Sequence, residues 1–226
     1  AVDGIDFEVR KGETLGVVGE SGCGKSTMGR VITRLQDPTG GSIHFEGRDI
    51  TRLNAAGLRP LRRDIQMIFQ DPYGSLNPRH TVGKIVGAPF KLQNVKTEHG
   101  VKKAVQELLE LVGLNPEHYN RYPHEFSGGQ RQRIGIARAL ALKPKLVVAD
   151  EPVSALDVSV QAQILDLLAG MQQRLGFAML FITHDLRVAS RICDRIAVMR
   201  QGRIVEEGEP AALFGAPREA YTRELL

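Results

Sequence analysis

Apolar positions along the chain follow three patterns, two of which predict strands and one helices. Continuous apolar runs bounded by turn residues predict buried strands at 15–18, 65–69, 146–149 and 178–183. Alternation of apolar and polar residues predicts further β structure at 2–9. A strand pair at 42–45 and 48–50 is predicted across the turn Glu46-Gly47, and a closing hairpin at 196–199 and 203–205.

Apolar residues repeated every three and four positions predict amphipathic helices at 82–90, 101–112, 128–142, 160–175 and 185–192. From 146 to 192 predicted strands and helices alternate, which favours an α/β fold with a mainly parallel sheet, interrupted by helices at roughly 71–142. We expect a single domain over 1–226. In it, 1–70 and 143–226 form the core with an N-terminal antiparallel β subdomain, and about 71–142 forms an inserted helical subdomain.

Composition places the chain among ordinary globular proteins, with 226 residues, 42% apolar and 25% charged. Its apolar runs are shorter than the ~20 residues of a membrane-spanning helix, and no secretory signal is recognisable. The two cysteines, Cys23 and Cys193, form no disulfide framework. These features predict a cytosolic chain.

Charge adds little to this picture. The net charge is +4, but the basic residues are scattered, with short clusters at 59–63 and 131–133. Aromatic residues make up only 5% of the chain, and none alternate with basic ones as in a single-strand binding platform. Charge therefore favours a solvated basic surface and by itself leaves the partner undecided; taking all motifs together, we expect no nucleic-acid partner.

Residues 19–27 fit the phosphate-loop pattern G-x-x-x-x-G-K-[ST] and follow a predicted strand. They are Gly19, Glu20, Ser21, Gly22, Cys23, Gly24, Lys25, Ser26 and Thr27. Glycines let the backbone turn its N–H groups toward phosphate oxygens at a helix start. Lys25 is expected to contact the β- and γ-phosphates, and the Ser26 hydroxyl to bind Mg²⁺. The alternative is a structural glycine-rich turn with a surface lysine.

Two adjacent carboxylates, Asp150 and Glu151, end the predicted strand 146–149. Ligands of open α/β sheets bind at this carboxyl edge. Asp150 is expected to hold Mg²⁺, and Glu151 to act as the base that polarises the attacking water. Alternatively, these acids begin a helix and stabilise its dipole.

A second glycine turn is formed by Ser127, Gly128, Gly129 and Gln130. Serine and glutamine three residues apart also make a capping box, which explains the first and last residue without any ligand. It leaves two glycines in the first helical turn, where each lowers helix stability by up to about 1 kcal/mol. Close approach of the backbone to an anion explains them, so we interpret the turn as a second phosphate site.

In their order along the chain, these motifs resemble those of ATP-binding cassette (ABC) ATPases. The likeness adds Gln70, the segment Ser154-Ala155-Leu156-Asp157 and His184, and it covers essentially the whole chain. It implies a P-loop NTPase core that binds and hydrolyses ATP with Mg²⁺.

The resemblance also implies residue roles. Gln70 senses Mg²⁺ and the attacking water, His184 contacts the γ-phosphate, and Asp157 bridges two subunits. Each has a plainer alternative: a strand-end loop residue for Gln70, a capped strand-to-helix histidine for His184, and a helix N-cap for Asp157.

Assembly follows from the same resemblance. The turn at 127–130 closes over ATP held by a second ATPase subunit, identical or paralogous, so Ser127, Gly128, Gly129, Gln130 and Asp157 act in trans. ATP then favours a closed dimer, and hydrolysis releases it.

Longer stretches at 69–79, 122–126, 151–161 and 221–223 resemble the ATPase subunits of oligopeptide and dipeptide importers. That likeness implies a peripheral protein on the cytoplasmic face of the membrane, bound to integral permease subunits through the helical insertion and indirectly to an extracytoplasmic solute-binding protein. Alternatives are an ATPase of chromosome maintenance or DNA repair and a translation-associated ABC factor. The family's adenine-stacking aromatic residue has no convincing counterpart, because Phe7 is too close to the phosphate loop. We therefore expect the chain to be trimmed at its N-terminus, and we leave open whether it is also trimmed after Leu226.

Overall fold

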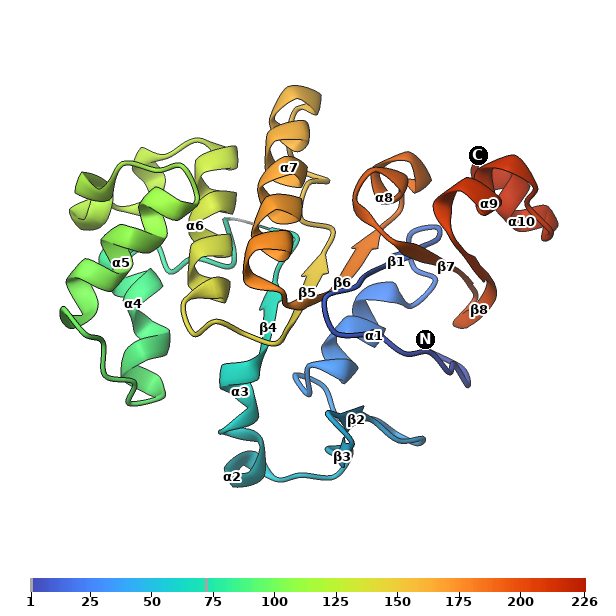
Figure 1. The fold of residues 1–226 in the computed structure, drawn as a ribbon, viewed down its shortest axis with the longest axis horizontal. Helices are drawn as coiled ribbons and strands as arrows, with labels where there is room; N and C mark the ends of the chain where they lie inside the picture. Colours follow the sequence, from blue (N-terminus) through green and yellow to red (C-terminus); the bar gives the residue numbers. More distant parts are fainter. Residues whose placement is uncertain (1, 72) are drawn as a thin grey trace.

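The computed structural model, described over residues 2–71 and 73–226, has a central six-stranded sheet in the order β4-β5-β6-β1-β7-β8 (Figure 1). Its strands are β1 (Thr14–Val18), β4 (Ile65–Ile68), β5 (Leu146–Asp150), β6 (Ala178–Thr183), β7 (Arg195–Arg200) and β8 (Arg203–Gly208). All neighbours pair in parallel except β7 and β8. The predicted α/β class and mainly parallel sheet are confirmed.

Strand residues alternate between two apolar clusters, one on each face of the sheet. Leu15 and Val17 of β1 belong to the smaller cluster with Met28 of α1 (Lys25–Ile32), whereas Val18 belongs to the larger one. The larger cluster continues under α7 (Val158–Leu175) and α8 (Leu186–Ile192) into the helical part. Two faces covered in this way explain why the core strands read as continuous apolar runs.

The segment predicted to be helical forms its own small bundle, on the left of Figure 1. It contains α4 (Val82–Leu92), α5 (Gly100–Leu111) and α6 (Gly128–Leu140), joined by the 3-10 helices η1 (Pro116–Asn120) and η2 (Pro123–Glu125). Three of the helices pack on one another, and α6 also contacts β4 and α7. The helices predicted at 82–90, 101–112 and 128–142 form, and Pro72 of the loop before them lies outside the described residues.

Several small elements complete the fold. They are the antiparallel pair β2 (His44–Phe45) and β3 (Arg48–Asp49) and the short helices α2 (Ala55–Leu58), α3 (Leu61–Asp64), α9 (Pro210–Gly215) and α10 (Ala220–Leu225). The β pair was predicted, but the four helices were not. Within the described residues, no helix combines the length and the apolar character that a bilayer crossing requires.

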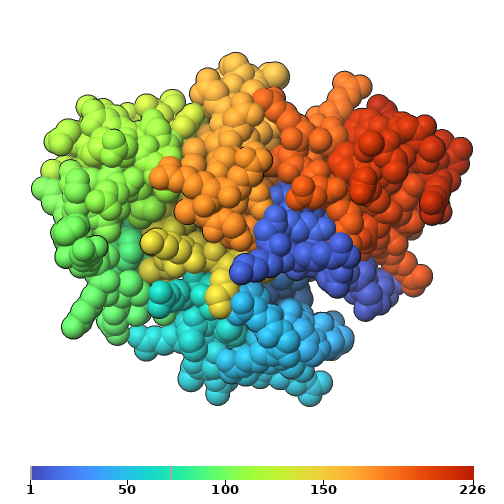
Figure 2. Space-filling view, in the orientation of Figure 1, coloured from blue at the N-terminus to red at the C-terminus, as the bar shows by residue number. Residues whose placement is uncertain are grey.

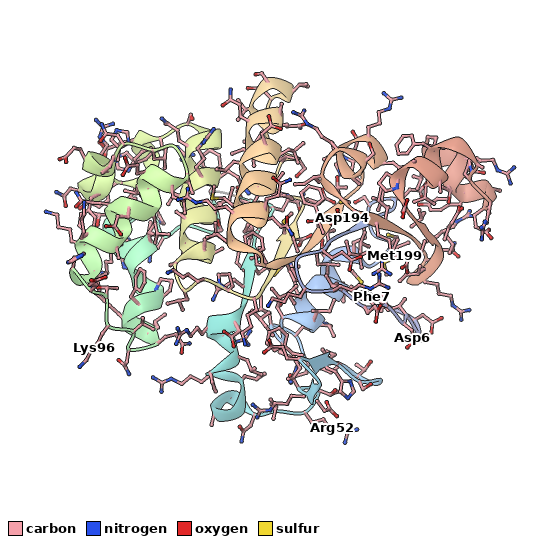
Figure 3. The ribbon with its side chains drawn as sticks, in the orientation of Figure 1. Asp6, Phe7, Arg52, Lys96, Asp194 and Met199 are labelled. Carbon is pink, nitrogen blue, oxygen red and sulfur yellow. The ribbon has the colours of Figure 1, made fainter. Side chains whose placement is uncertain are left out.

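The prediction of a strand at 2–9 is wrong. No strand forms there, although Ile5, Phe7 and Val9 are half-buried against the smaller cluster and the residues between them are exposed. Figure 3 shows Phe7 close to Met199, and in Figure 2 the segment lies on the surface. Alternation reports which side chains meet a core, and it does not report whether the backbone pairs with a neighbour.

Candidate functional site

The loop between β1 and α1 folds around the ammonium group of its own lysine. Lys25 is 4% exposed, and its Nζ donates to the carbonyl oxygens of Gly19 at 2.6 Å and Glu20 at 2.8 Å. Its Nζ also lies 3.7 Å from the sulfur of Cys23. The loop carbonyls therefore satisfy a buried positive charge that has no carboxylate partner in its hydrogen bonds.

The start of α1 is suited to an anion. Gly24 caps the helix with φ of 111°, a conformation that glycine adopts without steric cost. Because glycine has no side chain, the first N–H groups of the helix receive no side-chain cap and can bind phosphate oxygens. Of the other predicted residues, Ser21 and Gly22 lie exposed, while Ser26 and Thr27 are half-buried in the first turn.

Ser26 and Asp150 meet beside this loop. The serine Oγ donates to the aspartate Oδ1 at 2.8 Å, although 124 positions separate the two residues. Asp150 ends β5 and is 3% exposed; burial raises the pKa of its carboxyl, and the hydrogen bond from Ser26 opposes that rise.

These two groups fit a magnesium ion. A hydroxyl and a carboxylate are the oxygen ligands that Mg²⁺ uses together with waters and nucleotide phosphates. A cation would also compensate a carboxylate whose ionised form is disfavoured by burial. Among the described residues, no three His, Cys, Asp or Glu side chains are arranged to bind a metal, so protein ligands alone do not complete such a site.

Glu151 receives contacts from two other segments of the chain. Its Oε2 lies 3.3 Å from Nε2 of Gln70, which follows β4, and 3.1 Å from Nδ1 of His184, which follows β6. The glutamate side chain is 13% exposed and the histidine side chain 55% exposed. The carboxyl ends of three adjacent strands thus bring together an acid, an amide and an imidazole.

The backbone of Glu151 has a conformation that non-glycine residues rarely adopt, with φ of 45°. Its N–H donates to the carbonyl of Ile182, and its carbonyl accepts from Ser154 Oγ. Ser154 Oγ also accepts from Gln70 Nε2 at 3.4 Å. Backbone strain of this kind is typical of functional sites. Sequence reasoning did not assign Ser154 a role, although the Ser154–Asp157 motif contains it.

The turn at 127–130 forms the capping box that its sequence predicts. Ser127 Oγ accepts from the N–H of Gln130, and the Gln130 side chain accepts from the N–H of Ser127. The serine hydroxyl still has a proton to donate, and glycines occupy the next two positions. The cap and an anion site are therefore compatible.

Packing within the chain explains one of the two glycines. A Cβ at Gly129 would lie 2.5 Å from Cγ1 of Val160, near the start of α7, which is too close for any side chain. A Cβ at Gly128 would lie 3.4 Å from Cδ2 of Leu156, an ordinary contact. Asp157 precedes α7 as its N-cap, but its exposed side chain makes no capping hydrogen bond.

The predicted residues thus form two groups in this chain. One contains Lys25, Ser26, Gln70, Asp150, Glu151 and His184. Hydrogen bonds join Ser26 to Asp150, and Gln70 and His184 to Glu151, while Lys25 with Ser26 and Asp150 with Glu151 are neighbours in the chain. The other contains the turn 127–130 and the start of α7, with Asp157. Among the hydrogen bonds of the described residues, none joins a side chain of one group to the other.

The chain is similar to known proteins along its whole length. Residues 2–154 match the family model described as ABC transporter. The whole chain is 54% identical to the oligopeptide transport ATP-binding protein AppF of Bacillus subtilis, spanning 69% of that protein. It is 55% identical to the glutathione import ATP-binding protein GsiA of Pectobacterium atrosepticum, spanning 36% of that protein.

A solved structure is similar over nearly its full length. It is the dimeric, post-hydrolysis state of the ATP-binding cassette MJ0796 bound to ADP and Pi. The TM-score is 0.83 and the sequence identity 31%, with 92% of this chain and 90% of that chain covered.

Proposed function

The chain belongs to the ABC transporter family, and from that premise we propose that it binds and hydrolyses ATP to power a membrane importer of di- or oligopeptides. The contact of Glu151 with both Gln70 and His184, beside the phosphate loop, carries the proposal. The names of the relatives, oligopeptide transport and glutathione import ATP-binding proteins, support the direction of transport and the solute class. The 71–126 segment weighs against the chromosome-maintenance alternative, whose ATPases resemble this chain but carry a long coiled coil at this place. Its described part contains the short helices α4 and α5 instead.

In this proposal the hydrolytic step depends on Glu151. Its carboxylate accepts a proton from the attacking water, while the contacts from Gln70 and His184 fix the direction of one carboxylate oxygen. Lys25 donates to the β- and γ-phosphates, where it neutralises charge. Ser26 and Asp150, with Gln70, hold Mg²⁺, which neutralises phosphate charge when bound.

The second half of the site comes from another subunit, in a two-fold, head-to-tail dimer. Ser127, Gly128, Gly129 and Gln130 present the second phosphate site, and Asp157 crosses the interface. Support comes from the exposed, non-capping side chain of Asp157 and from the dimeric state of the similar cassette. The partner is a copy of the chain or a paralogue.

The remaining partners complete an importer. Permease subunits in the membrane dock on the helical insertion, and a solute-binding protein outside the membrane delivers the peptide. The chain then acts as a peripheral subunit on the cytoplasmic face of the membrane.

Mixing two inactive variants tests the shared site in the case of two identical subunits. Lys25→Ala removes the phosphate-loop charge, and Gly128→Asp places a negative charge in the turn at 127–130. Each variant alone is expected to hydrolyse no ATP. In a mixed dimer one site inherits both changes and the other neither, so an equimolar mixture is expected to regain about a quarter of the wild-type rate.

The readout is phosphate release, measured for each variant alone and for the mixture. A mixture as inactive as its components, when crosslinking shows that mixed dimers form, would contradict a site built from two subunits.

A further inference from the structure

We propose that Tyr221 is a positioning residue for the phosphate loop, acting through the peptide unit between Gly19 and Glu20. This inference rests on the proposed role of Lys25 in ATP binding. Tyr221 belongs to α10, near the red C-terminal end in Figure 1 and beyond the 2–154 segment that matches the family model.

The contact joins the two ends of the chain. The N–H of Glu20 donates to the hydroxyl oxygen of Tyr221 at 3.0 Å, across a separation of 201 positions. Tyr221 is 3% exposed, and the guanidinium of Arg200 lies 4.7 Å from the centre of its ring. Burial raises the pKa of the phenol, so a neutral hydroxyl makes this contact.

The same peptide unit holds the catalytic lysine. In a planar trans peptide the C=O and the N–H point in opposite directions. Here the N–H of Glu20 faces Tyr221, and the C=O of Gly19 accepts from Lys25 Nζ at 2.6 Å. Rotation of this peptide would therefore break both contacts together, so the tyrosine hydroxyl fixes the carbonyl that places the ammonium group.

A second contact holds the loop from the same side. The N–H of Gly202, in the turn between β7 and β8, donates to the carbonyl of Cys23 at 2.9 Å. The C-terminal hairpin and α10 together thus bind outward-facing backbone groups near both ends of the loop. Among the described residues, the N–H of Cys23 donates to the carbonyl of Glu20 at 3.3 Å, whereas those of Lys25 and Ser26 make no hydrogen bond and can bind phosphate. A loop held in this way before the ligand arrives is preorganised, which favours binding.

Tyr221→Phe tests the proposal because it keeps the ring and removes only the hydroxyl. A partly buried N–H left without its acceptor destabilises the loop conformation, and we expect the Kd for a fluorescent ATP analogue to rise about tenfold. The KM for ATP should rise in parallel, while kcat stays within about twofold of wild type.

Thr222→Val is the matched control. Thr222 is the next residue of α10, is 0% exposed, and its hydroxyl makes no hydrogen bond to the described part of the loop. It tests whether any disturbance of α10 has the same effect, and its Kd and KM are expected to stay within about twofold of wild type. Melting temperatures of both variants, measured without nucleotide, report whether α10 remains docked.

Two results would overturn the inference: an unchanged Kd in Tyr221→Phe, or an equal rise in Thr222→Val. Lys25→Ala distinguishes this failure from failure of the proposed function. If Lys25→Ala binds the ATP analogue normally, the phosphate-loop assignment itself is wrong. If Lys25→Ala loses binding and Tyr221→Phe does not, only the role of Tyr221 is rejected.

Discussion

The two parts of the candidate site are built from contacts of different range. The group with Lys25, Ser26, Gln70, Asp150, Glu151 and His184 is the hydrolytic side. In it, Ser26 contacts Asp150, which lies 124 positions away in the sequence, and Gln70 contacts Glu151, 81 positions away. At the turn 127–130, both side-chain hydrogen bonds span three positions. The first part therefore depends on the whole sheet, whereas the second needs little more than a correctly started α6.

This difference indicates which part of the site one chain can form by itself and which part needs a ligand from outside the chain. The hydrolytic residues already contact one another, so the fold of one chain orients them. In the turn 127–130, the capping box satisfies the N–H groups of Ser127 and Gln130. Among the hydrogen bonds of the described residues, none is donated by the Ser127 hydroxyl, and the two glycines leave the backbone open. Such a surface gains a function only when an anion is brought to it, and in the proposed dimer that anion belongs to the facing subunit.

The largest effect is expected on the hydrolytic side. Glu151→Gln keeps the size of the side chain but removes the carboxylate proposed to accept the proton, so the ATPase rate should fall at least about 100-fold. ATP binding should persist, because the residues of the phosphate loop are unchanged. Phosphate release measures the ATPase rate. Size-exclusion chromatography in ATP measures whether ATP still binds, because bound ATP that is not hydrolysed should trap a dimer. Unimpaired turnover in this variant would contradict the assignment of Glu151 as the base.

The sequence predicted most of this site because its signals are local. Glycine spacing at 19–27, a strand ending in Asp150 and the serine–glutamine pair at 127 and 130 can each be read within a few residues. The core strands and long helices were predicted for the same reason, since their apolar periods span one element.

What the sequence did not reveal depends on long-range packing. The left-handed backbone of Glu151 and the hydrogen bond between Glu20 and Tyr221 exist only in the assembled fold. The strand predicted at 2–9 does not form, because strand formation requires a neighbouring strand to pair with and does not follow from alternation of apolar residues alone. Gly129 has a role in packing against Val160 that no spacing rule contains.

The two glycines of the turn separate local packing from ligand approach. Gly129→Ala would push α6 away from Val160, and overpacking of this kind destabilises by about 1–3 kcal/mol. Gly128→Ala meets only an ordinary contact, so its melting temperature should stay the same or rise slightly. If Gly128 lies against an anion, its ATPase rate should nevertheless fall, by about tenfold. Thermal melts and phosphate release on both variants measure the two effects.

Relief of the predicted clash supplies the control. In the double variant Gly129→Ala/Val160→Ala the methyl carbons that the new Cβ would meet are gone, so stability should recover relative to Gly129→Ala alone. Recovery of ATPase activity along with stability would show that Gly129 is needed for packing only. A Gly128→Ala variant with full activity would contradict close approach of an anion at that position.

The smallest effect is expected on thermal stability and concerns the buried carboxyl of Asp150, on the hydrolytic side. The turn 127–130 contains no charged residue. The folded-state pKa of Asp150 is raised, chiefly by burial, so its stabilising contribution is greatest below the unfolded pKa and is lost as pH rises through the folded pKa. Asp150→Asn should therefore raise the melting temperature by a few degrees at neutral pH, without nucleotide, and by less in acid.

Asp49 provides a control of opposite sign for this last effect. Hydrogen bonds from Thr51 lower the pKa of its exposed carboxyl, so its contribution to stability is present above the unfolded pKa and is lost as pH falls through the folded pKa. Asp49→Asn should accordingly lower the melting temperature slightly at neutral pH. Melting curves of wild type and both variants, recorded from acid to neutral pH, measure the two trends. If the melting temperature of Asp150→Asn equals that of wild type at every pH, the ionised carboxylate of Asp150 does not destabilise the fold, and a bound cation would have no such destabilisation to offset.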